Sequence, residues 1–233
     1  MAWPGLLSPG RLALAARLFI WQFNPMTERT SVLVERQPLV VHTRPALEMN
    51  DEQFFQFCQL NRDLQIERTA EGDIIIMAPE GGSSGAGSGE LAIELGIWAR
   101  GDGTGRVFGS STGFKLPNGA TRSPDASWVR KERLQTLTAE QWHKFLPLCP
   151  DFVIELRSPS DSLLNLQKKM EEYRENGAQL GWLFDPESKQ VHVYRPATPV
   201  EVLDNPETVS AEPLLRGFVL AVPPIWAVME LED

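Results

Sequence analysis

The spacing of hydrophobic residues between positions 49 and 77 predicts a helix followed by a β-hairpin. Residues 49–60 carry three apolar side chains on one helical face, and Asn50 stands before them as an N-cap. Two runs of strand-forming residues follow, 65–69 and 73–77, joined by the turn AEG. An N-terminal helix and hairpin are therefore expected.

The rest of the chain alternates short apolar runs, typical of strands, with segments of helical period. Helices are expected at 90–100, at 138–145 and at 161–176, where Gly177 ends the last of them. Strands are expected at 106–110, 113–117, 125–129, 151–156, 180–185 and 190–195. This order predicts an α/β fold in which a central mixed β-sheet is flanked by helices.

Length and composition indicate one domain with an appendage at the start. A chain of 233 residues with 42% hydrophobic content is long enough for one well-cored α/β domain and short for two. We expect residues 26–233 to form that domain and residues 1–25 to be a disordered extension. Arg11 and Arg17 interrupt the apolar run of this extension, so it is too short to span a bilayer. A short amphipathic segment on a membrane surface is the alternative.

The charge and the metal-binding residue types limit the function classes. A net charge of −9 counts against a protein that coats nucleic acid, because such binding relies on lysine and arginine. Two distant cysteines indicate a reducing compartment, here taken as the cytoplasm. Since the three histidines are isolated, any metal would be a hard ion held by carboxylates. A local basic strip could still bind nucleic acid; its candidates are Arg122, Arg130, Lys131, Arg133, Lys144, Lys168 and Lys169. The alternative is that these residues are scattered, solvated charges on the surface.

The run EGGSSGAGSG, residues 80–89, predicts a glycine-rich loop between a strand and a helix. Such a loop can hold a phosphate at a helix N-terminus, but no Gly-Lys-Ser/Thr follows, and a dinucleotide fingerprint is poorly matched. A flexible loop that lets a substrate approach the helix fits the sequence better than a nucleotide site.

Two carboxylates on separate strands are the strongest candidates for chemistry. Asp125 begins one strand, and Glu155 lies inside another among apolar residues. An ionised carboxylate in such surroundings is costly unless it is paired or binds a metal. Arg157, on the same side of the strand, offers a plain ion pair as the alternative for Glu155, and Ser-Pro-Asp is a common turn sequence that could explain Asp125.

A lysine on the following helix could complete this site. On a helical wheel, Lys169 lies at the edge of the apolar stripe of residues 161–176, whereas Lys168 lies on the far side. Lys169 could then stabilise charge on a phosphate while Asp125 and Glu155 hold Mg²⁺. The alternative is a lysine whose stem only covers the apolar stripe.

The segments STGFKLPNGATRSPDASWV and LCPDFVIELRSPSDSLLNLQKKMEEYRENGAQLGWLFDPESKQVHVYRP resemble the Uma-two type endonucleases, within the restriction-endonuclease-like PD-(D/E)XK superfamily. The resemblance spans roughly residues 45–230. It implies a core of helix, three strands, helix and strand around a metal site. Asp125, Glu155 and Lys169 match the family's aspartate, glutamate and relocated lysine, so Arg157 need not be the catalytic base. Glu90 matches an acidic position of the first helix that supplies a metal contact in related folds.

The preferred interpretation is an endonuclease that hydrolyses DNA phosphodiester bonds with Mg²⁺, or Mn²⁺ as the alternative ion, held by Asp125, Glu155 and Glu90. Lys169 would position the nucleophile or neutralise developing charge. A homodimer is expected because cutting both strands of a duplex is simplest with two sites related by a twofold axis. Two other interpretations stay open. One is a non-catalytic module that keeps the nuclease fold, binds DNA or a protein, and places Arg157 where the metal would be; the other is a small-molecule or nucleotide-binding protein.

Overall fold

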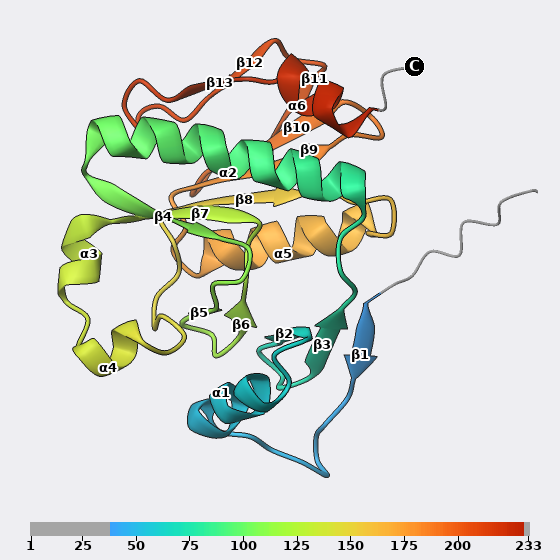
Figure 1. Cartoon of the computed structure of the whole chain (residues 1–233), viewed down its shortest axis with the longest axis vertical. Coiled ribbons are helices and arrows are strands. Elements are labelled where there is room, and N and C mark those ends of the chain that lie inside the picture. Colours follow the sequence, from blue (N-terminus) through green and yellow to red (C-terminus); the bar gives the residue numbers. More distant parts are fainter. Residues whose placement is uncertain (1–37, 231–233) are drawn as a thin grey trace, which may run out of the picture. The chain divides into compact units, whose positions relative to one another are not determined.

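A six-stranded sheet forms the centre of this computed structural model, which describes residues 38–230 (Figure 1). Its strand order is β11-β10-β9-β8-β7-β4. β8 and β9 run parallel, and every other neighbouring pair is antiparallel. The predicted mixed sheet is therefore confirmed. The strands are β4 (Gly105–Gly109), β7 (Ala126–Arg130), β8 (Phe152–Leu156), β9 (Leu180–Asp185), β10 (Gln190–Tyr194) and β11 (Glu201–Asp204).

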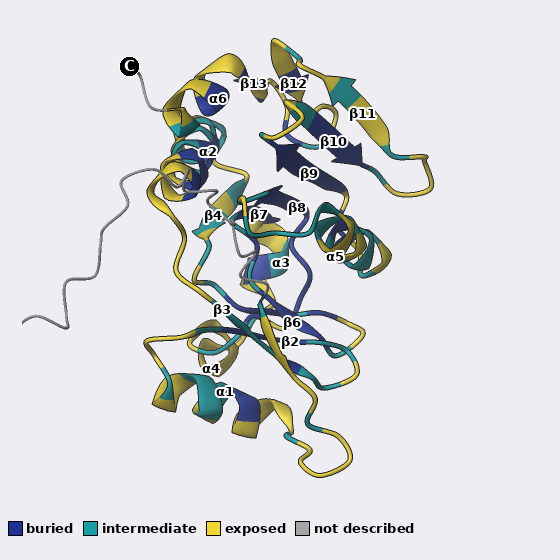
Figure 2. Cartoon of the chain, turned by 90° about the vertical axis from the view of Figure 1, so that its right-hand side faces the viewer, coloured by how far each residue is buried: buried dark blue, intermediate teal, exposed yellow. Residues whose placement is uncertain are grey.

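Two helices cover opposite faces of this sheet. α2 (Gly82–Asp102) lies along one face and α5 (Leu163–Glu175) along the other (Figure 1). Leu91 and Leu95 of α2 belong to one hydrophobic cluster, and Met170 of α5 belongs to the other. β8 and β9 are buried along their whole length between these layers (Figure 2).

The alternation of side chains along β8 decides which residues meet α5. Ile154 packs in the cluster on the α2 side, whereas Val153 packs in the cluster on the α5 side. Because successive strand residues point to opposite faces, Glu155 shares the side of Val153 and points toward α5. This places a buried carboxylate beneath the helix that carries Lys169.

The N-terminal helix and hairpin are also confirmed, as parts of a second sheet. α1 (Asp51–Leu60) begins at Asn50, whose side chain accepts from the backbone N–H of Gln53 in a capping box. Its buried Phe54 packs against Ile66 and Ile74 of the sheet. The strands of this sheet, in spatial order, are β1 (Leu39–Val41), β3 (Ile74–Met77), β2 (Gln65–Arg68), β6 (Thr121–Arg122) and β5 (Phe114–Lys115).

The remaining elements close the edges of the fold. Ile225 and Trp226 of α6 join the hydrophobic cluster beneath α2. None of the helices in the described residues is long and apolar enough to cross a membrane. The expected extension, residues 1–25, lies outside the described residues. These elements are α3 (Lys131–Gln135), α4 (Ala139–Trp142), α6 (Pro223–Met229), β12 (Thr208–Ser210) and β13 (Val219–Ala221).

The glycine-rich run is helical rather than a loop, which corrects the sequence prediction. α2 starts at Gly82, directly after the N-cap Gly81. A Cβ at Gly87 would lie only 2.8 Å from the Leu156 side chain and 2.9 Å from that of Met229. The small residues let the helix approach β8 closely, and this packing outweighs the poor helix propensity of glycine.

Candidate active site

A cavity of about 320 Å³ lies where the first turn of α2, the end of β8 and α5 come together. Three of the four residues expected to carry chemistry line it: Asp125, Glu155 and Lys169. Glu80, Ser84 and Asp161 are among its other lining residues.

Glu155 is 3% exposed and makes two contacts to α5 through the same carboxylate oxygen. Lys169 Nζ lies 2.9 Å from Oε1, and the Tyr173 hydroxyl donates to Oε1 at 3.0 Å. Burial raises the pKa of Glu155, the nearby charge of Glu67 raises it further, and Lys169 offsets part of this rise. The partner that the buried glutamate requires therefore comes from the helix.

Asp125 lies immediately before β7 and is tied to the neighbouring strand. Its Oδ2 accepts from the backbone N–H of Leu156 at 2.7 Å, which places it beside Glu155. Its other oxygen, Oδ1, accepts no hydrogen bond within the described part of the chain. Burial raises the pKa of Asp125 well above its usual range, and the charge of Glu155 adds to the rise. Two adjacent carboxylates that disfavour each other's ionisation form a setting that a cation would stabilise.

Lys169 lies between two buried carboxylates. Its Nζ is 2.9 Å from Glu67 Oε1 and 2.9 Å from Glu155 Oε1, and the side chain is 14% exposed. Lys168 is exposed, as the helical wheel predicts. Burial alone would lower the pKa of Lys169, but the carboxylates of Glu155, Glu67 and Asp125 outweigh it and raise that pKa. Lys169 is thus held as a cation at neutral pH.

Glu67 is the residue of this cluster that sequence reasoning missed. It lies on β2, is 2% exposed, and accepts from Arg122 Nη1 at 3.1 Å and from the backbone N–H of Ser123 at 2.9 Å. Burial would raise the pKa of Glu67, yet Lys169 and Arg122 lower it below its ordinary value. The only sequence signal was a carboxylate in a short hairpin strand, and its cationic partners come from segments far along the chain.

Glu90 does not line the cavity, whereas Glu80 does. The charge of Glu80 contributes to the raised pKa of Asp125. Because α2 begins at Gly82, Glu90 lies two turns into the helix, away from the end that faces the cavity. Of the acidic residues before and within α2, Glu80 is therefore the one placed to act with Asp125 and Glu155.

Arg157 does not pair with Glu155, so the alternative of a plain ion pair between them is wrong. Its Nη1 lies 2.9 Å from Asp185 Oδ1 and 2.6 Å from Glu187 Oε2. The backbone N–H of Arg157 donates to Phe184 O, which directs the chain toward the end of β9. Arg157 therefore leaves the space beside Asp125 and Glu155 open.

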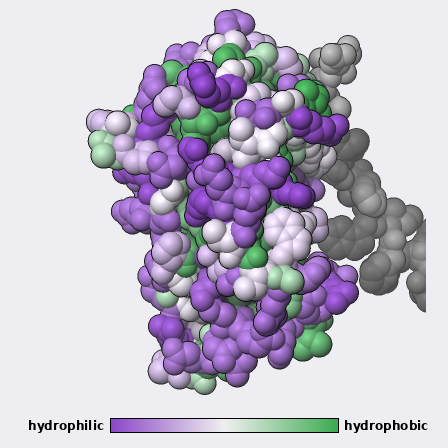
Figure 3. Space-filling view, turned by 90° about the vertical axis from the view of Figure 1, so that its left-hand side faces the viewer, coloured by the Kyte–Doolittle hydropathy of each residue, from purple (hydrophilic) through white to green (hydrophobic). Residues whose placement is uncertain are grey.

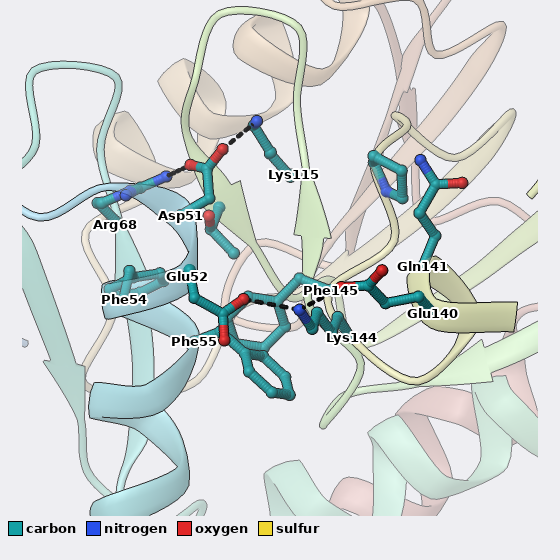
Figure 4. Close-up of a pocket in the computed structure, with 12 residues that line it drawn as sticks. Asp51, Glu52, Phe54, Phe55, Arg68, Lys115, Glu140, Gln141, Lys144 and Phe145 are labelled. Carbon is teal, nitrogen blue, oxygen red and sulfur yellow. Dashed lines mark hydrogen bonds and ion pairs between the residues drawn. The ribbon is translucent and has the colours of Figure 1, made fainter. Parts of the chain in front are cut away.

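Most cations of the suggested basic strip are already paired. Arg122 binds Glu67 and Glu172, and Arg130 and Arg133 both contact Asp151, which lies just before β8. A second cavity, of about 180 Å³, repeats this pattern: Lys144 contacts Glu52 and Glu140, while Arg68 and Lys115 contact Asp51 (Figure 4). A continuous row of free cations is therefore not formed by these residues.

The donor set fits a hard divalent cation. Within residues 38–230, no three His, Cys, Asp or Glu side chains are grouped closely enough to hold a metal by themselves. Mg²⁺, however, is commonly bound by one or two carboxylates and several waters. Asp125 has an oxygen without a protein donor, and Glu155 lies beside it in the same cavity. This pair matches that type of site, and the charge of Glu80 adds to the negative field at Asp125.

Comparisons with known proteins agree with the fold. The family model Uma2, described as "Putative restriction endonuclease", matches residues 51–223. A solved structure described as a "putative nuclease belonging to DUF820", from Anabaena variabilis ATCC 29413, superposes with a TM-score of 0.65 at 21% identity. The match covers 78% of this chain and 100% of that one. No curated protein matches this sequence.

Proposed function

We propose that this chain, which belongs to the Uma2 family of restriction-endonuclease-like proteins, is a Mg²⁺-dependent nuclease that hydrolyses phosphodiester bonds in DNA. One observation carries the proposal: Asp125 and Glu155, on adjacent strands, line one cavity with a lysine that is held charged. Mn²⁺ could replace Mg²⁺, because both are bound by carboxylate oxygens.

Each residue has a distinct role in this proposal. Asp125 and Glu155 would hold the ion, which supplies Lewis-acid polarisation of the phosphate and a more acidic bound water. Lys169 stabilises negative charge that develops on the phosphate. Since the carboxylates around it raise its pKa, the proposal gives Lys169 the role of a charge stabiliser rather than of a general base. Glu67 keeps the ammonium group of Lys169 in place.

Metal binding and cleavage are tested in the same samples. We expect calorimetry to detect Mg²⁺ or Mn²⁺ binding to the wild type, and supercoiled plasmid to be nicked. Asp125→Asn keeps the shape of the side chain, and we expect it to lose both properties together. A variant that cleaves at the wild-type rate would refute the assignment.

Lys169 is tested against its exposed neighbour. Lys169→Met should abolish nicking, whereas Lys168→Met should leave it unchanged because Lys168 does not line the cavity. Lys169→Met also leaves the buried Glu155 without its cation, while Glu67 keeps Arg122, so both variants are compared below their measured unfolding temperatures. Equal activity of the two variants would exclude a role for Lys169 in the chemistry.

A non-catalytic binding module has less support. It would place Arg157 in the metal position, but Arg157 contacts Asp185 and Glu187 instead. The face of the protein shown in Figure 3 is mostly hydrophilic, and its hydrophobic residues are scattered rather than joined in one docking patch. If the wild type binds no metal and cleaves no plasmid in this experiment, the non-catalytic module becomes the better interpretation.

We also propose that the protein acts in the cytoplasm as a homodimer. Both cysteines, Cys58 and Cys149, are free, which suits a reducing compartment. Two copies would cut both strands of a duplex. Light scattering coupled to gel filtration tests the dimer: a molar mass near twice 26.1 kDa is expected, and a monomeric mass would contradict it.

A further inference from the structure

The first turn of α2 presents hydrogen-bond donors that the described residues do not use. Gly81 is the N-cap and offers no side-chain cap. The backbone N–H groups of Gly82, Ser83 and Ser84 donate to no acceptor within residues 38–230, whereas that of Gly85 donates to Gly81 O at 2.9 Å. Free N–H groups at the start of a helix of 21 residues attract an anion, because they also carry the positive end of the helix dipole.

A second observation at the same place is the hydroxyl of Ser84. Ser84 is 2% exposed and lines the active-site cavity, and its Oγ has no hydrogen-bond partner among residues 38–230. A buried hydroxyl without a partner costs free energy, so its retention at a cavity wall needs an explanation. A ligand oxygen in the cavity would give this hydroxyl an acceptor.

The nearby carboxylate of Glu80 does not occupy these donors. Glu80 Oε1 accepts from Ser88 Oγ at 3.4 Å, and its Oε2 lies 3.7 Å from where a Cβ of Gly85 would be. Glu80 therefore lies along the side of α2, next to its second turn. The first turn stays open to the cavity.

We propose that the first turn of α2 binds a phosphate group of the nucleic-acid backbone, through the N–H groups of Gly82, Ser83 and Ser84 and the Ser84 hydroxyl. The proposal rests on the proposed nuclease function, since the phosphate then belongs to the same substrate as the scissile bond. It explains how an acidic protein recognises a polyanion: uncharged donors replace the arginine and lysine side chains that are paired elsewhere in the fold.

Two variants remove donors without removing packing. Ser84→Ala deletes only the unpartnered hydroxyl, so it should fold at least as stably as the wild type. Gly82→Pro deletes one N–H at the first helical position, where proline is well tolerated. Gly81 is extended there, with ψ of 164°, and nothing lies within 4 Å of a Cβ at Gly82.

The matched control is Ser127→Ala. The Ser127 hydroxyl is also buried, with 0% exposure, and has no partner in the described part of the chain, but Ser127 does not line the cavity. Its loss should affect stability as that of Ser84 does and leave phosphate binding unchanged.

The first measurement is the affinity for inorganic phosphate, followed by ³¹P NMR line broadening, with Mg²⁺ present because the carboxylates of the metal-free cavity repel an anion. We expect Ser84→Ala to weaken binding about tenfold, Gly82→Pro to weaken it several-fold, and Ser127→Ala to match the wild type. Wild type that binds no phosphate, or a Ser84→Ala protein that binds it equally well, would overturn the subsite.

Plasmid nicking and salt dependence separate this subsite from the nuclease proposal. If wild type and Ser84→Ala nick with the same KM and bind phosphate equally, the subsite fails while the nuclease function stands. If both bind metal and phosphate as expected but neither nicks, the nuclease function fails and the subsite stands. Because neutral donors release few counterions, the affinity for a short duplex should also depend weakly on salt; a steep dependence would contradict recognition by these donors.

Discussion

Replacing Glu67 by glutamine is expected to destabilise the protein far more than the same change at an exposed ion pair. Glutamine keeps the size and one acceptor oxygen, so the hydrogen bond from the Ser123 N–H can persist. The charge is lost, and it faces Lys169 Nζ at 2.9 Å and Arg122 Nη1 at 3.1 Å. The change therefore tests the buried electrostatics of the site rather than its packing.

The expected loss of stability in Glu67→Gln depends on which carboxylate partners Arg122 and Lys169 keep. Removing one member of a buried ion pair costs roughly 3–5 kcal/mol. Arg122 still contacts Glu172 at 2.5 Å, and Lys169 still contacts Glu155 at 2.9 Å, so neither cation is left unpaired. We therefore expect the lower end, about 3 kcal/mol, which corresponds to a fall in Tm of roughly 6–12 °C for a domain of this size.

Urea denaturation and thermal unfolding give the measurement, with Glu52→Gln as the control. Glu52 contacts Lys144 at 2.7 Å, but its side chain is 50% exposed, so its loss should leave the urea midpoint nearly unchanged. If the two variants lose equal stability, burial does not strengthen the Glu67 contacts and the assignment of Glu67 as the anchor of Lys169 is wrong.

Three further changes test the packing and protonation of the site. Tyr173→Phe removes the hydroxyl that donates to Glu155, and urea denaturation should show a loss of about 1.5–3 kcal/mol; an unchanged midpoint would exclude this bond as a stabilising contact. Gly87→Ala should lose about 1–3 kcal/mol from overpacking against β8, whereas Gly89→Ala, with open space around it, should gain about 1 kcal/mol; the same sign for both would refute the close approach of α2. Because the raised pKa of Asp125 means that the folded state binds a proton more tightly than the unfolded state, metal-free wild type should lose stability as the pH rises above about 4 through the folded pKa. Asp125→Asn should lose less over the same range, since only the raised pKa of Glu155 remains; parallel pH profiles from urea titrations would contradict this.

Local patterns predicted the elements that carry the site. Asn50 caps α1 as expected, and the apolar period of α5 placed Lys169 inward and Lys168 outward. Both predictions depend on residues within a few positions of each other, where helix geometry alone decides the outcome. The alternation along β8 likewise gave the side on which Glu155 points.

Long-range pairing could not be predicted in the same way. Glu67 meets Lys169 only because the hairpin of the second sheet approaches α5, and no local pattern encodes that approach. The start of α2 was missed because the glycine-rich run has poor helix propensity, while the favourable term, close packing of Gly87 on β8, is a tertiary contact. The sequence predicted Glu90 as the acidic residue of α2 near the site, whereas Glu80 lines the cavity. This error has the same cause, because the position of each residue depends on where the helix begins.

Carboxylates outnumber cations around Lys169, and this excess affects how the cavity can bind a phosphate. Around Lys169, the carboxylates of Glu67, Asp125 and Glu155 face the two cations Lys169 and Arg122. Arg122 also contacts Glu172, so with every group ionised four carboxylates face two cations, and the cluster repels a phosphate by itself. Burial disfavours the charged form of Asp125 and raises its pKa, and the charge of Glu155 adds to this effect. A divalent cation beside Asp125 would neutralise this excess of negative charge, so the same carboxylates that oppose phosphate binding in the free protein would make it dependent on the metal.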